Sequence, residues 1–155
     1  MTPKEMSPCE LAQWMRTEQE SLKELSKVLR QHIAAIPEVI TADWLRGLKV
    51  GFERLKAHLE RTFEAQEEGG YLSIVTENRP TLSPQVEELR SEHQQILQLA
   101  HAILRDIEQA SPEKKVIVRD ICARAQRFME MVAEHDHREV MLTMVVCSQD
   151  LGGKG

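Results

Sequence analysis

Apolar residues recur along this chain at alternating steps of three and four positions, the spacing that places them on one face of an α-helix. Four long stretches carry this pattern, and short segments rich in proline, glycine and serine separate them. They predict helices over residues 8–35, 42–68, 84–109 and 112–147. Long amphipathic helices joined by short loops favour an all-α fold, an antiparallel up-down-up-down four-helix bundle, here as a single domain over residues 1–155.

Capping residues support these boundaries. A serine followed by a proline is typical of a helix start, and the pair occurs at Ser7, Ser83 and Ser111. The pair Gly69-Gly70 indicates the end of the second helix. Residues 71–76 fit a short helical or irregular segment, and the C-terminal SQDLGGKG is expected to be a frayed polar tail.

Polar residues interrupt the inward face of every predicted helix. In the last helix they are His135 and Glu139, one turn apart, and in the third helix His93. In the second helix they are Thr62 and Gln66, and in the first Gln19 or its neighbour Glu18. Counted from the loops at 1.5 Å per residue, these positions lie within a few turns of one height. Buried groups of this kind cost several kcal/mol unless something pairs with or coordinates them.

Two interpretations of this polar layer remain open. In the first, Gln19, Thr62 and Gln66 hydrogen-bond to the histidines and the glutamate, because amides and hydroxyls both donate and accept. In the second, the layer is a metal site inside the bundle. Two neutral imidazoles and one carboxylate, from His93, His135 and Glu139, then make a ligand set with open positions that suits iron(II) or zinc.

Other polar residues are less well placed for a metal. Glu18 is a candidate for an additional ligand, because a small rotation of its helix would turn it inward. His58 and His101 could approach each other in a relocated site, although neither lies on an inward face. His32 and His137 are expected at the surface or flanking the core. Glu67 is expected to be solvated at the end of the second helix.

Composition indicates an ordinary globular protein, with 41% hydrophobic and 29% charged residues. The net charge of −5 gives no reason to expect nucleic acid or an anionic membrane as a partner. No apolar run approaches the roughly 20 residues that a membrane-spanning helix needs. The N-terminal MTPKEMSPCE also lacks the apolar segment of a secretory signal.

The three cysteines, Cys9, Cys122 and Cys147, are odd in number and share no CxxC spacing. We therefore expect free thiols that behave as small apolar residues, in a reducing cytoplasm. Cys9 and Cys147 would lie near the same end of an antiparallel bundle, so a redox pair is the less favoured alternative.

Three segments carry a resemblance to a known family: LERTFEAQEEGGYL over residues 59–72, LRSEH ending at His93, and HDHRE from His135 to Glu139. They resemble the hemerythrin-like, or HHE cation-binding, family, and the similarity extends helix by helix over nearly the whole chain. It implies a four-helix bundle around a non-haem di-iron centre bridged by carboxylates, which binds dioxygen, other small oxidants or iron itself.

The resemblance also implies which residues would serve as ligands. The family's third-helix histidine falls on His93, and its fourth-helix histidine and glutamate fall on His135 and Glu139. Its first-helix histidine falls on Gln19, and its second-helix HxxxE falls on Thr62 and Gln66. The ligands of one iron, including a bridging carboxylate, are therefore replaced.

These observations together predict a degenerate site that binds at most one metal, a mononuclear iron or a zinc. The expected role is sensing, storage or binding of a small molecule such as dioxygen, rather than catalysis. The alternative is a metal-free bundle that acts as an interaction or regulatory module. An oxidase or peroxidase has the least support, because a second metal and a dedicated base are not evident.

Overall fold

The computed structural model describes residues 6–68 and 71–152, and nearly all of these residues are helical. In chain order the elements are α1 (Pro8–Ala34), α2 (Ala42–Glu68), the short α3 (Tyr71–Asn78), the 3₁₀ helix η2 (Pro80–Leu82), α4 (Ser83–Gln109) and α5 (Lys115–Gly152). The prediction of an all-α bundle is confirmed.

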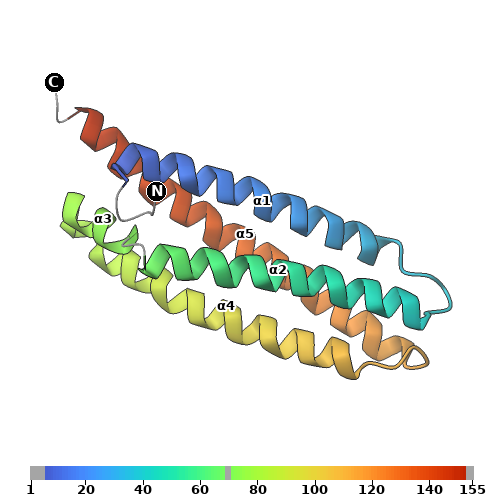
Figure 1. Ribbon diagram of the computed structural model, residues 1–155. Helices are drawn as coiled ribbons and strands as arrows, with labels where there is room; N and C mark the ends of the chain where they lie inside the picture. Colours follow the sequence, from blue (N-terminus) through green and yellow to red (C-terminus); the bar gives the residue numbers. More distant parts are fainter. Residues whose placement is uncertain (1–5, 69–70, 153–155) are drawn as a thin grey trace.

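The long helices α1, α2, α4 and α5 lie lengthwise beside one another (Figure 1). α1 packs against α2 and α5, and α4 packs against the same two helices, so each long helix has two long neighbours. The α1–α2 and α4–α5 connections lie at one end of the bundle, and α3 lies at the other (Figure 1). Consecutive long helices therefore run in opposite directions.

The helix boundaries agree with prediction most closely in the first half of the chain. The Ser7 hydroxyl accepts a hydrogen bond from the backbone N–H of Glu10 at 3.2 Å, which is the predicted N-cap of α1. Ser83 is not an N-cap, because η2 leads directly into α4 and the Ser83 hydroxyl donates to the carbonyl of Pro80. Gly69 and Gly70, the predicted stop of α2, lie outside the described residues.

The second half departs from prediction in two places. Ser111 does not cap α5: residues 111–114 form a turn, in which the Lys114 N–H bonds to the Ser111 carbonyl, and the helix begins at Lys115. The predicted polar tail is not frayed at its start, because α5 continues to Gly152. The end of that tail, residues 153–155, lies outside the described residues.

α3 closes the end of the bundle where the termini of α1 and α5 lie. Its Ile74 and Val75 are buried in a small apolar cluster with residues of α1, α4 and α5. The spacing that places His135 and Glu139 on the inward face of α5 also predicts that Leu142 faces inward. The inward face shifts at this end, however, because Leu142 is half-buried and Thr143 is fully buried. α3 also packs against α5, and its Ile74 and Val75 share the small cluster with Val140 and Val146 of α5.

A larger apolar cluster fills the rest of the bundle, with Phe52 and Phe128 among its fully buried side chains. Along α5 it ends at Val132, and the small cluster begins at Val140. The interval between them contains the polar layer. The bundle thus holds its polar groups between two dry compartments.

A disulfide joins Cys9, near the start of α1, to Cys147, near the end of α5. This corrects the expectation of three free thiols. Cys122 is the free cysteine among the described residues, and burial raises the pKa of its thiol to about 11. The cytoplasmic location was argued from free thiols, and that argument no longer holds, because disulfides persist mainly in oxidising compartments.

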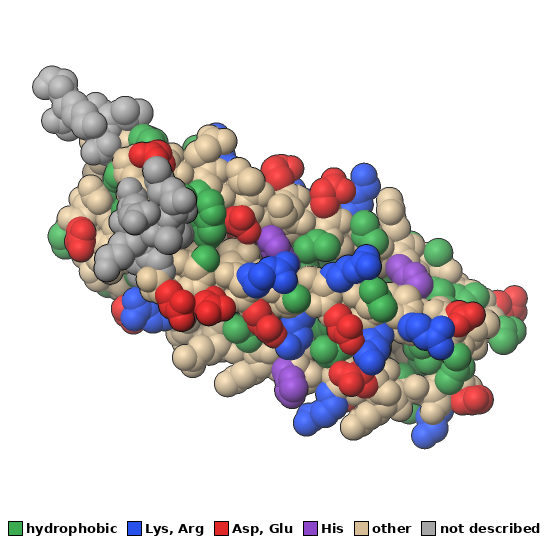
Figure 2. Space-filling view, in the orientation of Figure 1, with side chains coloured by type: hydrophobic (Ala, Val, Ile, Leu, Met, Phe, Trp, Pro, Cys, Tyr) green, Lys and Arg blue, Asp and Glu red, His purple; other side chains and the backbone are tan. Residues whose placement is uncertain are grey.

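The helices described here include none that is both long and apolar enough to cross a membrane. On the face shown in Figure 2, basic and acidic side chains are interspersed rather than gathered into a region of one sign.

The first prediction is that the fold survives removal of metal. Each well-buried side chain in the two apolar clusters contributes about 1.5–3 kcal/mol, so helicity should not depend on an ion at one layer. Circular dichroism melts with and without a strong chelator should both show a cooperative helical unfolding transition. Loss of helicity at room temperature on chelation would contradict this.

The second prediction concerns the disulfide. It closes a loop of 138 residues in sequence, so Cys9→Ser should lower the free energy of unfolding by about 2–5 kcal/mol. Urea unfolding should show the same loss when the wild type is reduced, and no further loss when Cys9→Ser is reduced. Cys122→Ala is the control, because it keeps the disulfide and should still respond to reductant. If the urea midpoint of the wild type were the same with and without reductant, Cys9 and Cys147 would not be joined in solution.

Candidate metal centre

The structure brings His93, His135 and Glu139 together in the interior of the bundle; we call them the central triad. The relative exposure of their side chains is 2%, 1% and 0%. The Nε2 atom of His93 lies 3.2 Å from Oε1 of Glu139, and Nε2 of His135 is in close contact with the same oxygen. One ligand atom from each residue lies within 4.8 Å of the others.

The helices position the triad by simple periodicity. His135 and Glu139 are four residues apart on α5 and therefore share one face of it. His93 reaches the same point from α4, which packs directly against α5. Phe63 of α2 stacks on the His93 ring with centroids 4.0 Å apart, and its ring meets the edge of His135 at 5.6 Å. The aromatic ring thus restricts both imidazoles.

Carboxylates hold the outer nitrogen of each imidazole. Nδ1 of His93 lies 3.2 Å from Oε1 of Glu67, and Nδ1 of His135 lies 2.6 Å from Oε2 of Glu92. Arg138 donates from Nη2 to both oxygens of Glu92, at 2.7 and 2.9 Å. A carboxylate at Nδ1 favours the tautomer whose proton is on Nδ1 and whose Nε2 lone pair is free, the arrangement common in metal-bound histidines.

Two buried acceptors of the triad lack regular hydrogen-bond partners. Oε2 of Glu139 has none, and Nε2 of His135 forms no regular hydrogen bond although Glu139 lies against it. Leaving a buried charged group incompletely paired costs free energy. A cation among these atoms would satisfy them, so the residues present fit a metal ion.

The protonation equilibria of the triad are coupled. Burial would raise the pKa of Glu139, but its contacts with His135 and His93 outweigh burial and lower it. Burial would likewise lower the pKa of His135, but the contacts with Glu139 and Glu92 raise it instead. Burial also opposes the ionised form of Glu92, and its bonds to His135 and Arg138 nevertheless lower its pKa. Without an ion, a proton on His135 therefore balances Glu139, and a cation would compete with that proton.

The positions where the family pattern is interrupted do not join the triad. Thr62 is buried and donates to Oε2 of Glu18 at 3.1 Å, and Gln66 is fully buried and donates to Sδ of Met15 at 3.4 Å. Gln19 lines a groove on the outside of α1 and α5. Among the described residues, therefore, none of these three makes the hydrogen bonds to the triad that the metal-free interpretation required of them. Glu18, rather than Gln19, reaches toward the polar layer.

The remaining histidines are divided between packing and the surface. His32 stacks on Trp44 at 4.7 Å, and its Nε2 lies 2.8 Å from the Trp44 carbonyl oxygen. His101 and His137 are exposed. His58 is half-buried, 3.7 Å from Oε2 of Glu18, so its neighbour is a carboxylate of α1 and the relocated His58–His101 pair does not form.

Sequence reasoning missed the carboxylates that orient the imidazoles. Glu67 was expected in solvent at the end of α2, yet it contacts His93 with its side chain 42% exposed. Glu92 lies one residue before His93 and bonds to the other histidine of the triad. Glu92 could have been identified from its position next to His93. A residue adjacent to an inward-facing histidine lies at the edge of the contact between α4 and α5, and Arg138 lies at the same edge.

Asp136 was also missed. It is 7% exposed, and its Oδ2 is buried without a hydrogen-bond partner. Burial first, and then the nearby charge of Glu139, raises the pKa of this carboxyl to about 7. Periodicity alone does not distinguish a buried acid next to an inward-facing histidine from an acid that faces solvent.

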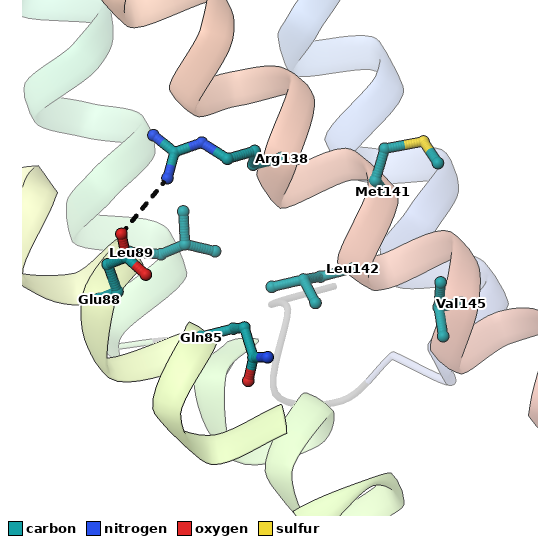
Figure 3. Close-up of a pocket in the computed structure, with 7 residues that line it drawn as sticks. All are labelled: Gln85, Glu88, Leu89, Arg138, Met141, Leu142 and Val145. Carbon is teal, nitrogen blue, oxygen red and sulfur yellow. Dashed lines mark ion pairs between the residues drawn. The ribbon is translucent and has the colours of Figure 1, made fainter. Parts of the chain in front are cut away.

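Outside the triad, α4 and α5 form an apolar pocket of about 250 Å³. Leu89 of α4 and Leu142 of α5 face the space between the two helices (Figure 3). Arg138 lies at its polar side, where its Nη1 is 3.9 Å from Oε1 of Glu88 (Figure 3). Arg138 therefore connects this surface pocket, through Glu92, to His135.

One protein-family sequence model, described as the hemerythrin HHE cation binding domain, matches residues 10–143. The matched stretch begins within α1, ends within α5 and includes the whole central triad. Neither a curated protein nor a solved structure gives a match to this chain.

The third prediction concerns the apoprotein and Asp136. Because its pKa in the folded protein is raised to about 7, Asp136 favours folding at low pH, and that contribution is lost as pH rises toward 7. The free energy of unfolding of Asp136→Asn, relative to that of the wild type, should therefore increase as pH rises from about 4 to 7. The increase should be up to about 1.4 kcal/mol for each pH unit. Urea unfolding in chelator at several pH values measures the difference.

Asp120→Asn is the matched control, because Asp120 is an exposed aspartate on the same helix. Its stability should run parallel to that of the wild type across this pH range. If the stability of Asp136→Asn also ran parallel to that of the wild type across this pH range, the raised pKa of a buried Asp136 would be contradicted.

Proposed function

The chain belongs to the family of hemerythrin HHE cation-binding domains, and from this premise we propose that His93, His135 and Glu139 bind a single divalent metal ion, iron(II) or zinc. The protein would sense or store that ion or bind a small molecule at it, rather than catalyse a reaction. The half of the family site that falls on Gln19, Thr62 and Gln66 does not contribute ligands.

One observation carries the proposal: two imidazole Nε2 atoms converge on one carboxylate oxygen while each Nδ1 is held by a separate carboxylate. Three electron-rich atoms that face each other in a dry interior repel one another unless a proton or a cation lies among them. The outer carboxylates prepare the neutral, metal-binding tautomer of both rings. The arrangement therefore suits a cation better than it suits a layer of neutral hydrogen bonds.

The donor set bears on which ion binds. Two nitrogens and one oxygen, with further coordination positions open, suit iron(II) or zinc better than calcium or magnesium, which prefer oxygen ligands alone. A bound ion of this kind supplies a place where a small molecule such as dioxygen can be held. The chain's own residues orient the rings, through Phe63, Glu67 and Glu92, and exclude water, through the two apolar clusters.

Binding or sensing is favoured over catalysis because the two acids that contact the outer nitrogens of the histidines are already engaged. Glu67 and Glu92 contact the Nδ1 atoms, and Arg138 holds Glu92 in a bidentate pair. Neither carboxylate is therefore free to act as a general base at the centre. Storage or sensing requires only that the ion bind reversibly.

A second candidate function, a metal-free interaction or regulatory module, has one observation in its favour. The raised pKa of His135 lets a proton balance Glu139, so the chain from Glu67 through the triad to Arg138 can pair internally without an ion. Metal content of the purified protein separates the two candidates.

The fourth prediction tests the ligand assignment. Protein loaded with iron(II) or zinc and then dialysed should retain one ion per chain by elemental analysis. His135→Ala should abolish retention, and Glu92→Gln, which changes only the group behind the ligand, should weaken binding by about 10–100-fold. His137→Ala is the matched control: it removes an exposed histidine two residues away and should leave binding intact.

Equal losses from His135→Ala and His137→Ala would place the ion at a surface His-x-His pair. Folded wild-type protein that retains neither metal would instead favour the metal-free module.

A further inference from the structure

The disulfide between Cys9 and Cys147 lies in a surface groove rather than in the core. Both cysteines are half-buried, and both line a groove between α1 and α5 with a volume of about 380 Å³. The other residues that line this groove are Ala12, Gln13, Arg16, Met144 and Ser148. A small molecule in the groove can therefore reach the disulfide while the bundle stays folded.

The two sulfur atoms have different electrostatic surroundings. Cys9 is the second residue of α1, directly after Pro8, and Ser7 caps this helix. The N-terminal end of a helix carries a partial positive charge, which stabilises a thiolate located there. Cys147 lies near the other end of its own helix, because α5 ends at Gly152. The dipole of α5 gives a thiolate at Cys147 no such stabilisation.

A positive side chain lies in the same groove. Arg16 is about two turns from Cys9 along α1, and it donates from Nη2 to Sδ of Met144 at 3.2 Å. Met144 is neutral, and Arg16 forms no ion pair with any other residue that the structure describes. The charge of Arg16 is therefore available to an anionic molecule that enters the groove.

We propose that the Cys9–Cys147 disulfide is a thiol-exchange site that accepts small thiols carrying a carboxylate or a sulfonate. Arg16 attracts the anionic group, and the thiolate of the incoming molecule attacks Sγ of Cys147. The bond between the two protein sulfur atoms breaks, and its electron pair goes to Sγ of Cys9, which leaves as a thiolate. The product is a mixed disulfide on Cys147. Exchange is faster when the leaving thiolate is better stabilised, and this assigns Cys9 as the leaving group.

A second molecule of the thiol completes the reaction. Its thiolate attacks the sulfur of the first molecule in the mixed disulfide, so that Cys147 is released and a small-molecule disulfide forms. In total, two small thiols are oxidised to one disulfide, and the same two electrons reduce the protein disulfide to two thiol groups.

The disulfide holds the end of the bundle that α3 covers. Leu11 follows Cys9 by two residues, and Val146 directly precedes Cys147. Both side chains are buried in the small apolar cluster, whereas the larger cluster has no member adjacent to either cysteine. Exchange would therefore loosen this end of the bundle first. The inference does not rest on the central triad holding a metal.

The test uses oxidised protein that carries Cys122→Ala, so that Cys9 and Cys147 are its only cysteines. The probes are three thiols of similar size: anionic 2-mercaptoethanesulfonate, neutral 2-mercaptoethanol and cationic cysteamine. Each reaction is run without denaturant at low ionic strength and quenched with acid, and peptide mass spectrometry locates the adduct. We expect the first adduct on Cys147, with Cys9 as a free thiol.

Arg16→Gln tests the recognition of anionic thiols. The ratio of the exchange rate with the sulfonate to that with cysteamine should fall about three- to tenfold, because one charge near the sulfur atoms is removed. Arg30→Gln is the matched control: it removes an exposed arginine of the same helix that does not line this groove. It should keep the wild-type ratio.

Two serine variants test the choice of leaving group. At neutral pH, Cys9 in Cys147→Ser should react with iodoacetamide about threefold or more faster than Cys147 in Cys9→Ser. Circular dichroism establishes that each variant is folded before its rates are measured.

A first adduct found mainly on Cys9 would overturn the assignment of the leaving group. A ratio that is unchanged in Arg16→Gln would overturn the recognition of anionic thiols. If the disulfide of the folded protein resisted all three thiols and reacted only in urea, the inference as a whole would be overturned. Protein that keeps both thiols free after incubation with a small-molecule disulfide would overturn it as well.

Discussion

Glu139 is fully buried, and much of the surrounding structure can be understood as a response to a carboxylate placed there. An ionised group at that depth costs several kcal/mol unless positive or hydrogen-bonding groups compensate it. His93 and His135 supply that compensation from two helices, and each imidazole is in turn held by a carboxylate on its other nitrogen. The chain of contacts ends at Arg138 on the surface, so one buried charge orders residues on three helices.

The bundle makes this arrangement tolerable by placing it between two apolar clusters. The larger cluster includes Phe52 and Phe128, and the smaller one is completed by Ile74 and Val75 of α3. Both clusters keep water away from the triad without using its polar atoms. Because stability comes from the two clusters, the polar layer is free to vary in its residues, which agrees with the loss of half of the family's ligand pattern at Gln19, Thr62 and Gln66.

The sequence was sufficient for the helices and for the triad, because both depend on regular spacing within a helix. His135 and Glu139 share a helix face because they are four residues apart. The level of His93 along the bundle was predicted by counting residues from the loop that follows its helix. Features that depend on contacts between helices were not predictable in this way. The spacing predicts that Leu142 faces inward, and nothing in it indicates that this side chain lines a pocket between α4 and α5. Glu67 and Glu92 reach the imidazoles from the edges of their helices, where periodicity does not separate a bonded carboxylate from a solvated one.

The Cys9–Cys147 disulfide was the largest departure, since proximity of two residues 138 positions apart depends on the ends of two helices rather than on any local pattern. The bond turns most of the chain into a covalent ring. A single cut in the connection between α1 and α2 would therefore open the ring without releasing a fragment, and the helices on either side of the cut would stay tethered. The disulfide gives a second covalent connection between α1 and α5. New chain ends could therefore be placed in the α1–α2 connection while α1 stays covalently linked to α5.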